Sequence, residues 1–507
     1  MDTSYKRLAK NTIFLYIRTI ILMFIGVFTS RITLQALGID NYGIVNVVSG
    51  FVAMFALISG SLTSTCQRFI TYELGLEKPN TRDVFNTSVH IHLWLSIVII
   101  LIAETIGLYF VNNKLNIPDT QMVAVQWVYQ CSIISFIISL INIPYNAIII
   151  AHEKMAVFAY MSLLEGILKL SVVIALLYIS GNKLIIYSVL VLVSSILVRI
   201  TFQIYCRRTF NEQIKLKKKI DISYSKQIFG FAGWTIFGSS ATILSNQGVN
   251  IVLNIFCGVA VNAARGIAVM IENIITNFVN NFTTALNPQI TKAYASRDKG
   301  RLEYLVINGM SISFYLMMLL ALPIVVAAPY ILKIWFVSVP QYASVFVQFT
   351  LINALIVAMG NPFLTALMAS GKIKKYQVVV GLFTLCNLPG SYLLLKVGQS
   401  PISVYVLLVI ISLMSFVIRL FFLKHYIGLK IGAFIQPFIM KFIPIATISL
   451  AVSFIFLTVL EPVTLWYLLA YGVCSAISIG VVSFYIGLSK TQRNKVINYV
   501  LTKIPVQ

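Results

Sequence analysis

The sequence predicts an all-α integral membrane protein with fourteen transmembrane helices. Of its 507 residues, 59% are hydrophobic and only 10% are charged, and the mean hydropathy is +0.91. A soluble chain of average composition has about a quarter of its residues charged. Because one core cannot bury so much apolar surface, we expect the bilayer to solvate the rest, and helices satisfy their own backbone groups in lipid.

The fourteen expected spans are apolar stretches of about 20 residues or more, the length at which a helix crosses a bilayer. The first follows a basic start and is too long for the core of a cleavable signal, so it is expected to remain as a span. The expected limits are residues 11–36, 42–66, 85–111, 121–150, 155–180, 184–206, 228–256, 261–287, 304–332, 342–369, 376–396, 401–423, 436–460 and 463–487.

The basic residues predict the orientation of these spans. Lys and Arg number 38 against 15 Asp and Glu, a formal net charge of +23. If the N-terminus is cytoplasmic, cytoplasmic segments hold 28 of the 38 basic residues and the opposite side holds five. This positive-inside pattern predicts that both termini are cytoplasmic. It also explains the positive charge without a nucleic-acid partner, and none is expected.

Neither a metal site nor an enzyme active site is predicted. The six cysteines are scattered and contain no C-x-x-C pair, which argues against a zinc site or a disulfide framework. His90 and His92 are two positions apart and therefore face different sides of a helix. No nucleotide-binding motif and no nucleophile–base pair occurs, so we expect a transporter without cofactors or ATPase activity.

A weak internal repeat predicts two six-helix lobes. Residues "QRFITYELG" (67–75) align with "NPQITKAYA" (287–295) at a shift of 220, and "IPYNAIIIAHEK" (143–154) aligns with "NPFLTALMASGK" (361–372) at 218. Six spans is an even number, so both copies have the same orientation, as in parallel-repeat transporters. The predicted parts are an N-lobe (1–207), a basic cytoplasmic linker (208–227), a C-lobe (228–426), and spans 13 and 14 with a basic tail (427–507).

The repeat aligns Pro144 in span 4 with Pro362 in span 10. Proline interrupts the hydrogen bonds of a helix and can bend it. These residues are predicted either as matched kinks for gating or as packing features.

Charged residues inside spans are the candidate functional residues, because such side chains tend to face a cavity. Arg18 is predicted to line a cationic, substrate-binding cavity, with snorkelling to the cytoplasmic head groups as the alternative. Arg31 is predicted at the periplasmic mouth, on a different face of the same helix. Arg199 and Arg419 lie near cytoplasmic span ends and are interpreted as anchors.

Span 8 carries a polar stripe that predicts either a lumen or contacts that join helices. Arg265 and Glu272 are seven residues apart, which places them about 20° apart around the helix. Arg265 is a second candidate for substrate binding. The expected polar lining comprises Asn246, Asn250, Asn273, Asn277 and Asn280.

Three carboxylates inside spans are the candidates for ion coupling. Glu165 and Lys169 have the i, i+4 order that favours an ion pair on one helix. The pair either neutralises itself, or an arriving phosphate competes for Lys169, a third substrate-binding candidate, and leaves Glu165 to bind a proton. Glu104 and Glu272 complete the set, and H⁺ or Na⁺ is the expected coupling ion.

Three stretches carry a resemblance to a known family. They are "KNTIFLYIRTIILMFIGVFTSRITLQALGIDNYGIVN" (10–46), "STCQRFITYELG" (64–75) and "NPQITKAYASRDKGRL" (287–302). With the fourteen-span count and its 6 + 6 + 2 division, the whole chain resembles the O-antigen (Wzx-type) flippases for polysaccharide biosynthesis. These belong to the MATE/MOP superfamily and are related to lipid II flippases.

The resemblance implies a bacterial inner-membrane protein that works by alternating access. Such a protein moves an undecaprenyl-pyrophosphate-linked oligosaccharide from the cytoplasmic to the periplasmic leaflet, and cationic cavity residues engage the anionic substrate. It also implies a monomer, in contact with membrane lipids, that works beside a polysaccharide polymerase and glycosyltransferases. In some relatives the last two spans form a groove for the lipid tail.

Two other functions remain open from the sequence. A cation-coupled multidrug exporter shares the fold, but its site would favour acidic and aromatic residues over arginines. A membrane glycosyltransferase or polymerase would resemble chains with large outer loops or acidic metal-binding motifs, which this sequence lacks.

Overall fold

The computed structural model describes residues 2–53, 55–113, 121–217, 221–335, 339–430, 432–460, 464–488, 490 and 493–494. In these ranges the regular structure is helical, without strands. Eleven helices are long and apolar enough to cross a membrane, and a shorter apolar helix covers Asn11–Gly26. The prediction of an all-helical, multi-pass membrane protein is therefore confirmed. The count of fourteen spans and the position of the termini stay predictions.

The chain forms two compact units. The N unit holds Met1–Ser239 and Thr291–Asp298, and the C unit holds Ser240–Ile290 and Lys299–Gln507. The first boundary lies inside one long helix, α9 (Ile222–Ala295), which contributes residues to both units. The lobe limits expected from the repeat are not tested by this division.

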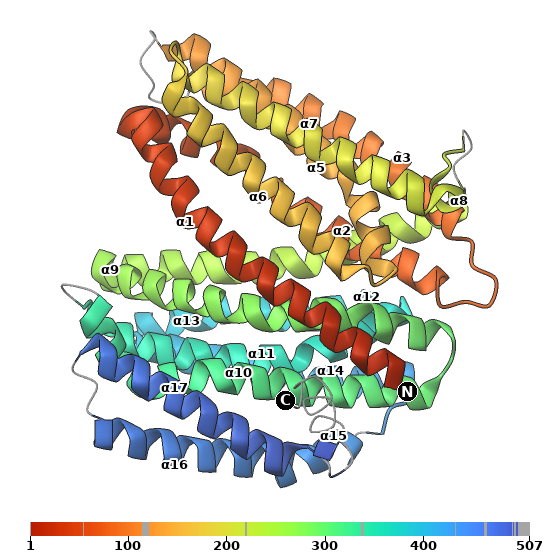
Figure 1. Ribbon diagram of the computed structural model, residues 1–507. Helices are drawn as coiled ribbons and strands as arrows, with labels where there is room; N and C mark the ends of the chain where they lie inside the picture. The colour runs from red at the N-terminus through yellow and green to blue at the C-terminus, as the bar shows by residue number, and fades with distance from the viewer. Residues whose placement is uncertain are drawn as a thin grey trace, which may run out of the picture. The chain divides into compact units, whose positions relative to one another are not determined.

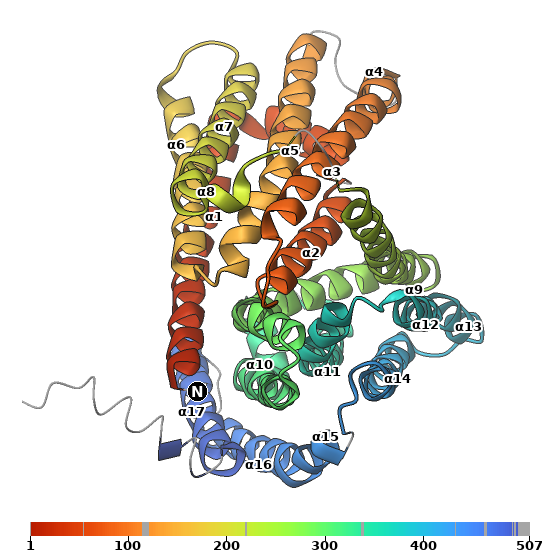
Figure 2. The ribbon, with the colours of Figure 1, turned by 90° about the vertical axis from the view of Figure 1, so that its right-hand side faces the viewer.

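In the N unit, helices from separate parts of the sequence pack side by side. Helix α1 lies along α6, and α5 lies along α7 and α2 (Figure 1; Figure 2). Besides parts of α9, its helices are α1 (Asp2–Ala53), α2 (Ala56–Glu73), α3 (Thr81–Ile102), the π-helix η1 (Ala103–Gly107), α4 (Leu108–Asn113), α5 (Met122–Ala151), α6 (Met155–Tyr178), α7 (Lys183–Thr209) and α8 (Asn211–Ile214).

In the C unit, α10 and α14 both pack on α11, and α16 lies beside α17 (Figure 1). The stacked rings of Phe346 and Tyr405, 4.1 Å apart, join α11 to α14 within its core. The helices after α9 are α10 (Lys299–Trp335), α11 (Ala343–Ser370), α12 (Lys374–Leu385), α13 (Asn387–Lys396), α14 (Ile402–Ile427), α15 (Gly432–Pro437), the π-helix η3 (Phe438–Phe442), α16 (Ile443–Leu460), α17 (Leu465–Val482) and the π-helix η4 (Ser483–Gly487).

Local sequence signals set several helix ends. The side chain of Asn182 accepts the backbone N–H groups of Leu184 and Ile185 at the start of α7, and Asp221 does the same at the start of α9. Such side chains satisfy donors that have no partner in the first turn. Gly371 and Gly428 end α11 and α14 with φ of 73° and 74°, a conformation that glycine adopts without strain.

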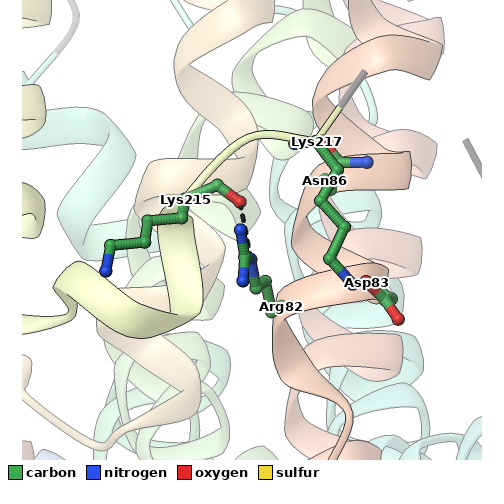
Figure 3. Close-up of polar contacts among 5 residues, drawn as sticks. All are labelled: Arg82, Asp83, Asn86, Lys215 and Lys217. Atoms are coloured by element: carbon green, nitrogen blue, oxygen red, sulfur yellow. Dashed lines mark hydrogen bonds and ion pairs between the residues drawn. The ribbon is translucent and has the colours of Figure 1, made fainter. Parts of the chain in front are cut away.

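The part of the basic linker that follows α8 is fixed to the start of α3 (Figure 3). Arg82 Nε donates to the carbonyl oxygen of Lys215 at 3.1 Å. The backbone N–H of Lys217 donates to Asn86 Oδ1 at 2.9 Å, and the ammonium of Lys217 pairs with Asp83. Residues 211–217 therefore belong structurally to the N unit.

The two units use the same packing at positions that the repeat aligns. Spans 4 and 6 form the α5–α7 pair in the N unit, and spans 10 and 12 form the α11–α14 pair in the C unit. Pro144 and Pro362 are both buried inside these helices. Pro362 also packs on α10, where its Cγ lies 3.2 Å from the position of a Cβ on Gly309.

The ends of α2 and α9, which the sequence repeat aligns with each other, are in contact within the N unit. A Cβ at Gly75, after α2, would lie 2.7 Å from the Cβ of Ala295 and 2.9 Å from the Cα of Lys292 in α9. Gly75 and Ala295 are themselves aligned by the shift of 220 residues. Lys292 Nζ also pairs with Glu153 Oε1 at 3.0 Å, and the Glu153 side chain is only 1% exposed. The last turn of α9 is thus tightly held against α2 and the end of α5.

This contact predicts that Gly75→Ala destabilises the protein. The added methyl group meets backbone atoms that cannot move away cheaply, and overpacking of this kind costs about 1–3 kcal/mol. The thermal unfolding midpoint in detergent should fall. Gly230→Ala is the matched control, because nothing lies within 4 Å of that position. Equal midpoints for the two variants would contradict the close approach.

Candidate functional site

A polar cavity of about 360 Å³ lies inside the N unit, between α1, α5, α6 and α7. We call it the N-unit cavity. Ligand pockets in proteins usually measure about 300–1,000 Å³, so this one is suited to a small group. Its charged and polar lining residues are Arg18, Ser139, Asn142, Asn146, Ser162, Glu165, Lys169, Ser194, Ser195 and Arg199.

The spacing along α6 places its contribution on one face of the helix. Ser162, Glu165 and Lys169 follow one another at intervals of three and four residues, which brings them above one another. Gly166 lets α1 come close, since a Cβ there would lie 2.6 Å from Cδ2 of Leu22. Arg18 lies one turn before Leu22 on α1, so this approach places it beside the polar face of α6.

Arg18 lines the N-unit cavity and stacks on an aromatic ring. Its guanidinium carbon lies 4.6 Å from the centre of the Phe158 ring, and the charge of Glu165 acts on it electrostatically. The ring and the guanidinium attract each other by about 0.5–2 kcal/mol, depending on desolvation. Nε of Arg18 is buried and has no hydrogen-bond partner among the described residues.

Lys169 and Glu165 form an ion pair along α6. Nζ of Lys169 donates to Glu165 Oε1 at 2.7 Å, with the two side chains 55% and 47% exposed. Exposed pairs at this spacing contribute only about 0.3–0.5 kcal/mol. The pair is therefore easily separated, and both groups remain accessible to a ligand.

Arg199 is a cavity residue that the sequence interpretation missed. Its Nη1 donates to Asn142 Oδ1 at 3.3 Å, and its guanidinium carbon lies 3.9 Å from the centre of the Tyr145 ring. The interpretation of Arg199 as an anchor used only its nearness to a span end. A usable signal was the four-residue spacing of Ser195 and Arg199, because it places a hydroxyl and a cation on one face of α7.

The lining of the N-unit cavity is positive. Arg18, Lys169 and Arg199 carry three positive charges, and Glu165 carries the one negative charge among the lining residues. Arg199 has a ring and an amide as its neighbours, and Arg18 has a ring and the shared charge of Glu165, so the cations outnumber the carboxylate. An anionic group entering the cavity would therefore meet cations that are held in place and still carry their charge.

The predicted polar stripe lies on α9 in the C unit. Asn273, Asn277 and Asn280 are exposed, whereas Ile275 and Val279 are buried in the C-unit core. A helix that crosses a membrane cannot present such a row of amides to lipid without a large cost, so this face requires water or other polar groups.

Arg265 is fixed near the start of this stripe. Its Nη2 donates to the carbonyl oxygen of Asn246 at 3.0 Å, and it interacts electrostatically with Glu272 and Tyr405. Asn246 is exposed and Asn250 is half-buried. The structure thus brings Arg265, Glu272 and Asn246 together.

The remaining candidate residues lie elsewhere. Glu104 belongs to the π-helix η1 and accepts a hydrogen bond from Gln130 Nε2 at 3.1 Å, and it is not among the lining residues of the N-unit cavity. Arg31 is part of α1, but its side chain lies outside the described residues. His90 and His92 each bond to a backbone carbonyl of their own helix. Within the described ranges, no group of three or more His, Cys, Asp or Glu could hold a metal.

The sequence model of the polysaccharide biosynthesis protein family matches residues 8–294. The chain belongs to this family. Comparison with curated protein sequences finds no match. The family match covers nearly all of the N unit and all of α9 except its last residue, including both sets of polar residues.

Solved structures with a similar fold are MATE and MOP-superfamily transporters. A MATE protein in the bent conformation matches with a TM-score of 0.73 and 13% identity, over 85% of this chain and 97% of the other. An outward-facing multidrug resistance MATE transporter of the MOP superfamily matches with a TM-score of 0.70 and 14% identity, over 83% and 97%.

A third match differs in the polarity of its pocket. It is a MOP-superfamily transporter from Pyrococcus furiosus, described as having a binding pocket of reverse polarity that suggests a different function. It matches with a TM-score of 0.65 and 13% identity, over 82% of this chain and 94% of the other. At these identities the likeness concerns the fold. The chain is therefore a multi-pass membrane protein of the polysaccharide biosynthesis family with a MATE-like fold.

The exposed amide row predicts that Asn277 is in contact with water. In a variant without native cysteines, Asn277→Cys should react with a membrane-impermeant thiol reagent about tenfold faster than Val279→Cys, since reaction requires an accessible thiolate. Val279 is the matched control because it lies two residues away on the same helix and is 1% exposed. Equal rates would mean that the stripe faces protein or lipid.

Proposed function

We propose that the protein is a flippase for an oligosaccharide linked to undecaprenyl pyrophosphate. It moves this lipid from the cytoplasmic to the periplasmic leaflet of a bacterial inner membrane. The family and the MATE-like fold support a transporter. The observation that carries the substrate class is the positive N-unit cavity, with Arg18, Lys169 and Arg199 around one carboxylate.

The physical task is to move a charged, hydrated head group across about 30 Å of hydrocarbon. The head group needs a polar path, and its phosphates need cations. Arginine presents a planar set of donors that matches phosphate oxygens. The amide row on α9 supplies donors and acceptors for sugar hydroxyls.

The lipid tail can stay in apolar surroundings. The C unit contains an apolar cavity of about 550 Å³ between α10, α11, α14 and α16, with Phe314, Met359 and Phe442 in its lining. Such a cavity suits a branched hydrocarbon chain, and α16 belongs to the last pair of spans, which the resemblance implies form a groove for the lipid tail in some relatives.

The proposed topology has fourteen spans with both termini in the cytoplasm. The equivalent packing of α5–α7 and α11–α14 supports two parallel repeats, as expected for alternating access. Pro144 and Pro362 are the proposed bending points. The protein works as a monomer beside a polymerase and glycosyltransferases, and Glu165, Glu272 and Glu104 are the candidate carriers of H⁺ or Na⁺.

Export of cationic drugs is the competing function within the same fold. A cavity with three positive charges and one negative charge repels cations, so the N-unit cavity disfavours this function. The pocket of reverse polarity in the Pyrococcus furiosus transporter indicates that this fold accommodates more than one polarity of site.

We expect Arg18→Ala and Arg265→Ala to slow leaflet exchange by about tenfold each, the effect of losing one hydrogen bond to a charged group. The assay uses the protein in liposomes with a labelled undecaprenyl-pyrophosphate oligosaccharide. Lys396→Ala is the control, because it removes the same charge from an exposed site in the C unit.

Exchange that is slowed in the arginine variants, with unfolding midpoints unchanged, would support phosphate binding by these residues. Undiminished exchange in Arg18→Ala would contradict its role in the cavity. Transport of a labelled hydrophobic cation in place of the lipid by the unaltered protein would favour drug export.

A further inference from the structure

We propose that Glu153 and Lys292 form a releasable lock that holds the last turn of α9 against the end of α5. We call it the α9 lock. Two features of Glu153 act in opposite directions on it: the ion pair of the carboxylate keeps the lock closed, and the strained backbone favours its release. Opening and closing is a property of the N unit, whereas the use of this motion in transport rests on the proposed function.

The backbone of Glu153 adopts a left-handed conformation at the end of α5. Its φ is 59°, which costs free energy for a residue with a Cβ, whereas glycine adopts such a φ without strain. The sequence repeat aligns Glu153 with Gly371 at a shift of 218 residues, and Gly371 has φ of 73°. The N–H of Glu153 donates to the carbonyl oxygen of Ile150, and that of Gly371 to the aligned carbonyl of Met368. The same turn is thus built with glutamate in the N unit and with glycine in the C unit.

The side chain of Glu153 makes a contact that glycine could not make. Its Oε1 pairs with Lys292 Nζ at 3.0 Å, and the side chain is only 1% exposed. A buried carboxylate that loses its cation is strongly unfavourable, so the pair opposes separation of α5 from α9. The backbone oxygen of Glu153 also accepts Nδ2 of Asn11 in α1 at 3.1 Å. One strained residue therefore connects three helices.

Lys292, and not the neighbouring histidine, supplies the positive charge of the lock. His152 stacks on Phe210 with ring centres 4.5 Å apart, and its Nε2 shares a hydrogen bond with Gln213 Oε1 at 2.8 Å. Burial lowers the pKa of His152, which keeps the ring neutral near pH 7. Lys292 is 27% exposed, so its ammonium can move into water when the lock opens.

The strain and the course of α9 make the lock releasable. Strain in a closed state is given back when the turn rearranges, and strained residues of this kind are found where a structure has two states. The locked turn lies in Thr291–Asp298, which belongs to the N unit, and the residues before it belong to the C unit. Pro288 lies just before this boundary and interrupts the hydrogen bonds of the helix. The last turn of α9 can therefore leave α5 without unfolding the rest of the N unit.

The test measures how often the last turn of α9 opens, with a buried thiol as the probe. In the full-length protein without native cysteines, Ala293→Cys places a thiol on that turn, and Ala147→Cys places one on α5 as the matched control. Ala293 is 2% exposed and Ala147 is 0% exposed, so each thiol reacts with a water-soluble reagent only when its surroundings open. Rates are divided by those of the same unfolded variant, which corrects for charges that act on the thiol.

With Glu153 in place and below the unfolding transition, Ala293→Cys should react about tenfold faster than Ala147→Cys, or more, because local opening costs less than unfolding of the core. Equal rates would mean that the contact opens only when the N unit unfolds, and they would overturn the lock. The thermal unfolding midpoint of every variant is measured, and all rates are compared below the lowest midpoint.

Substitutions of Glu153 separate the ion pair from the strain. Glu153→Gln removes the charge and keeps the strained backbone, so Ala293→Cys should react about thirtyfold faster. Glu153→Gly removes both, so the rate should be about fivefold lower than with glutamine and still above that with glutamate. Ala147→Cys should react at an unchanged rate in both backgrounds. Reaction of Ala293→Cys that is unaffected by both substitutions, or slower with glutamine than with glycine, would overturn the proposal.

Lys292→Gln tests whether the two side chains act as one pair. It should also speed the reaction of Ala293→Cys, and its combination with Glu153→Gln should react no faster than the faster single variant, because one interaction can be lost only once. Effects that multiply in the combined variant would show independent action and would overturn the pair as the lock.

The thiol rates do not depend on transport, so their outcomes are separate from those of the flippase assay. If the unaltered protein moves no lipid-linked oligosaccharide but Ala293→Cys responds to Glu153→Gln as expected, the flippase proposal fails and the lock stands. If lipid exchange is intact and Ala293→Cys reacts as slowly as Ala147→Cys, the lock fails and the flippase proposal stands.

Discussion

The structure of the N unit depends on one constraint, which is that an ionised side chain inside a membrane must have polar or polarisable neighbours. Each cation of the N-unit cavity meets this need differently. Arg18 stacks on Phe158, Arg199 combines the Tyr145 ring with the Asn142 amide, and Lys169 pairs with Glu165. Aromatic faces and amides stabilise a cation without cancelling its charge. The cavity therefore keeps a net positive charge although each of its cations has a stabilising neighbour.

Helix packing makes this arrangement possible. The absence of a side chain at Gly166 lets α1 approach α6 at Leu22, and small residues commonly allow such approaches between membrane helices. The same contact fixes the height of Arg18 relative to Glu165. Gly166, which allows the close packing of α1 on α6, therefore also determines that Arg18 lies near Glu165. The electrostatics of the cavity thus depend on the packing of helices that are distant in sequence.

Periodicity revealed the features that lie within one helix. The Glu165–Lys169 pair and the alternation of Asn273, Asn277 and Asn280 with buried residues follow from 3.6 residues per turn. The all-helical membrane class followed from composition. The features that depend on two helices did not follow from the sequence. Arg199 was interpreted as an anchor because its depth was counted from the end of its own span, whereas its position in the cavity lining depends on its contacts with Asn142 and Tyr145 on α5.

The sequence repeat lies between these two cases, features within one helix and contacts between two helices, because its alignment relates positions that are far apart in the chain. It aligned Gly75 with Ala295, and these two residues are in contact. It could not indicate that contact, because an alignment equates positions without saying how equivalent segments meet. For the same reason it matched Pro144 with Pro362 but gave no means of deciding between bending and packing.

The two units present different polar chemistry, and this difference bears on specificity. The N-unit cavity offers full charges, while the exposed face of α9 in the C unit offers mainly amides with one arginine and one carboxylate. Hydrogen bonds to charged groups contribute about 1.5–3 kcal/mol, and neutral ones about 0.5–1.5 kcal/mol. If the protein moves a lipid-linked oligosaccharide, the charged groups recognise the anionic part that all such lipids share. Amides form weaker hydrogen bonds with sugar hydroxyls and can do so in many arrangements. Under that function, the protein would be more selective for the lipid carrier than for the glycan attached to it.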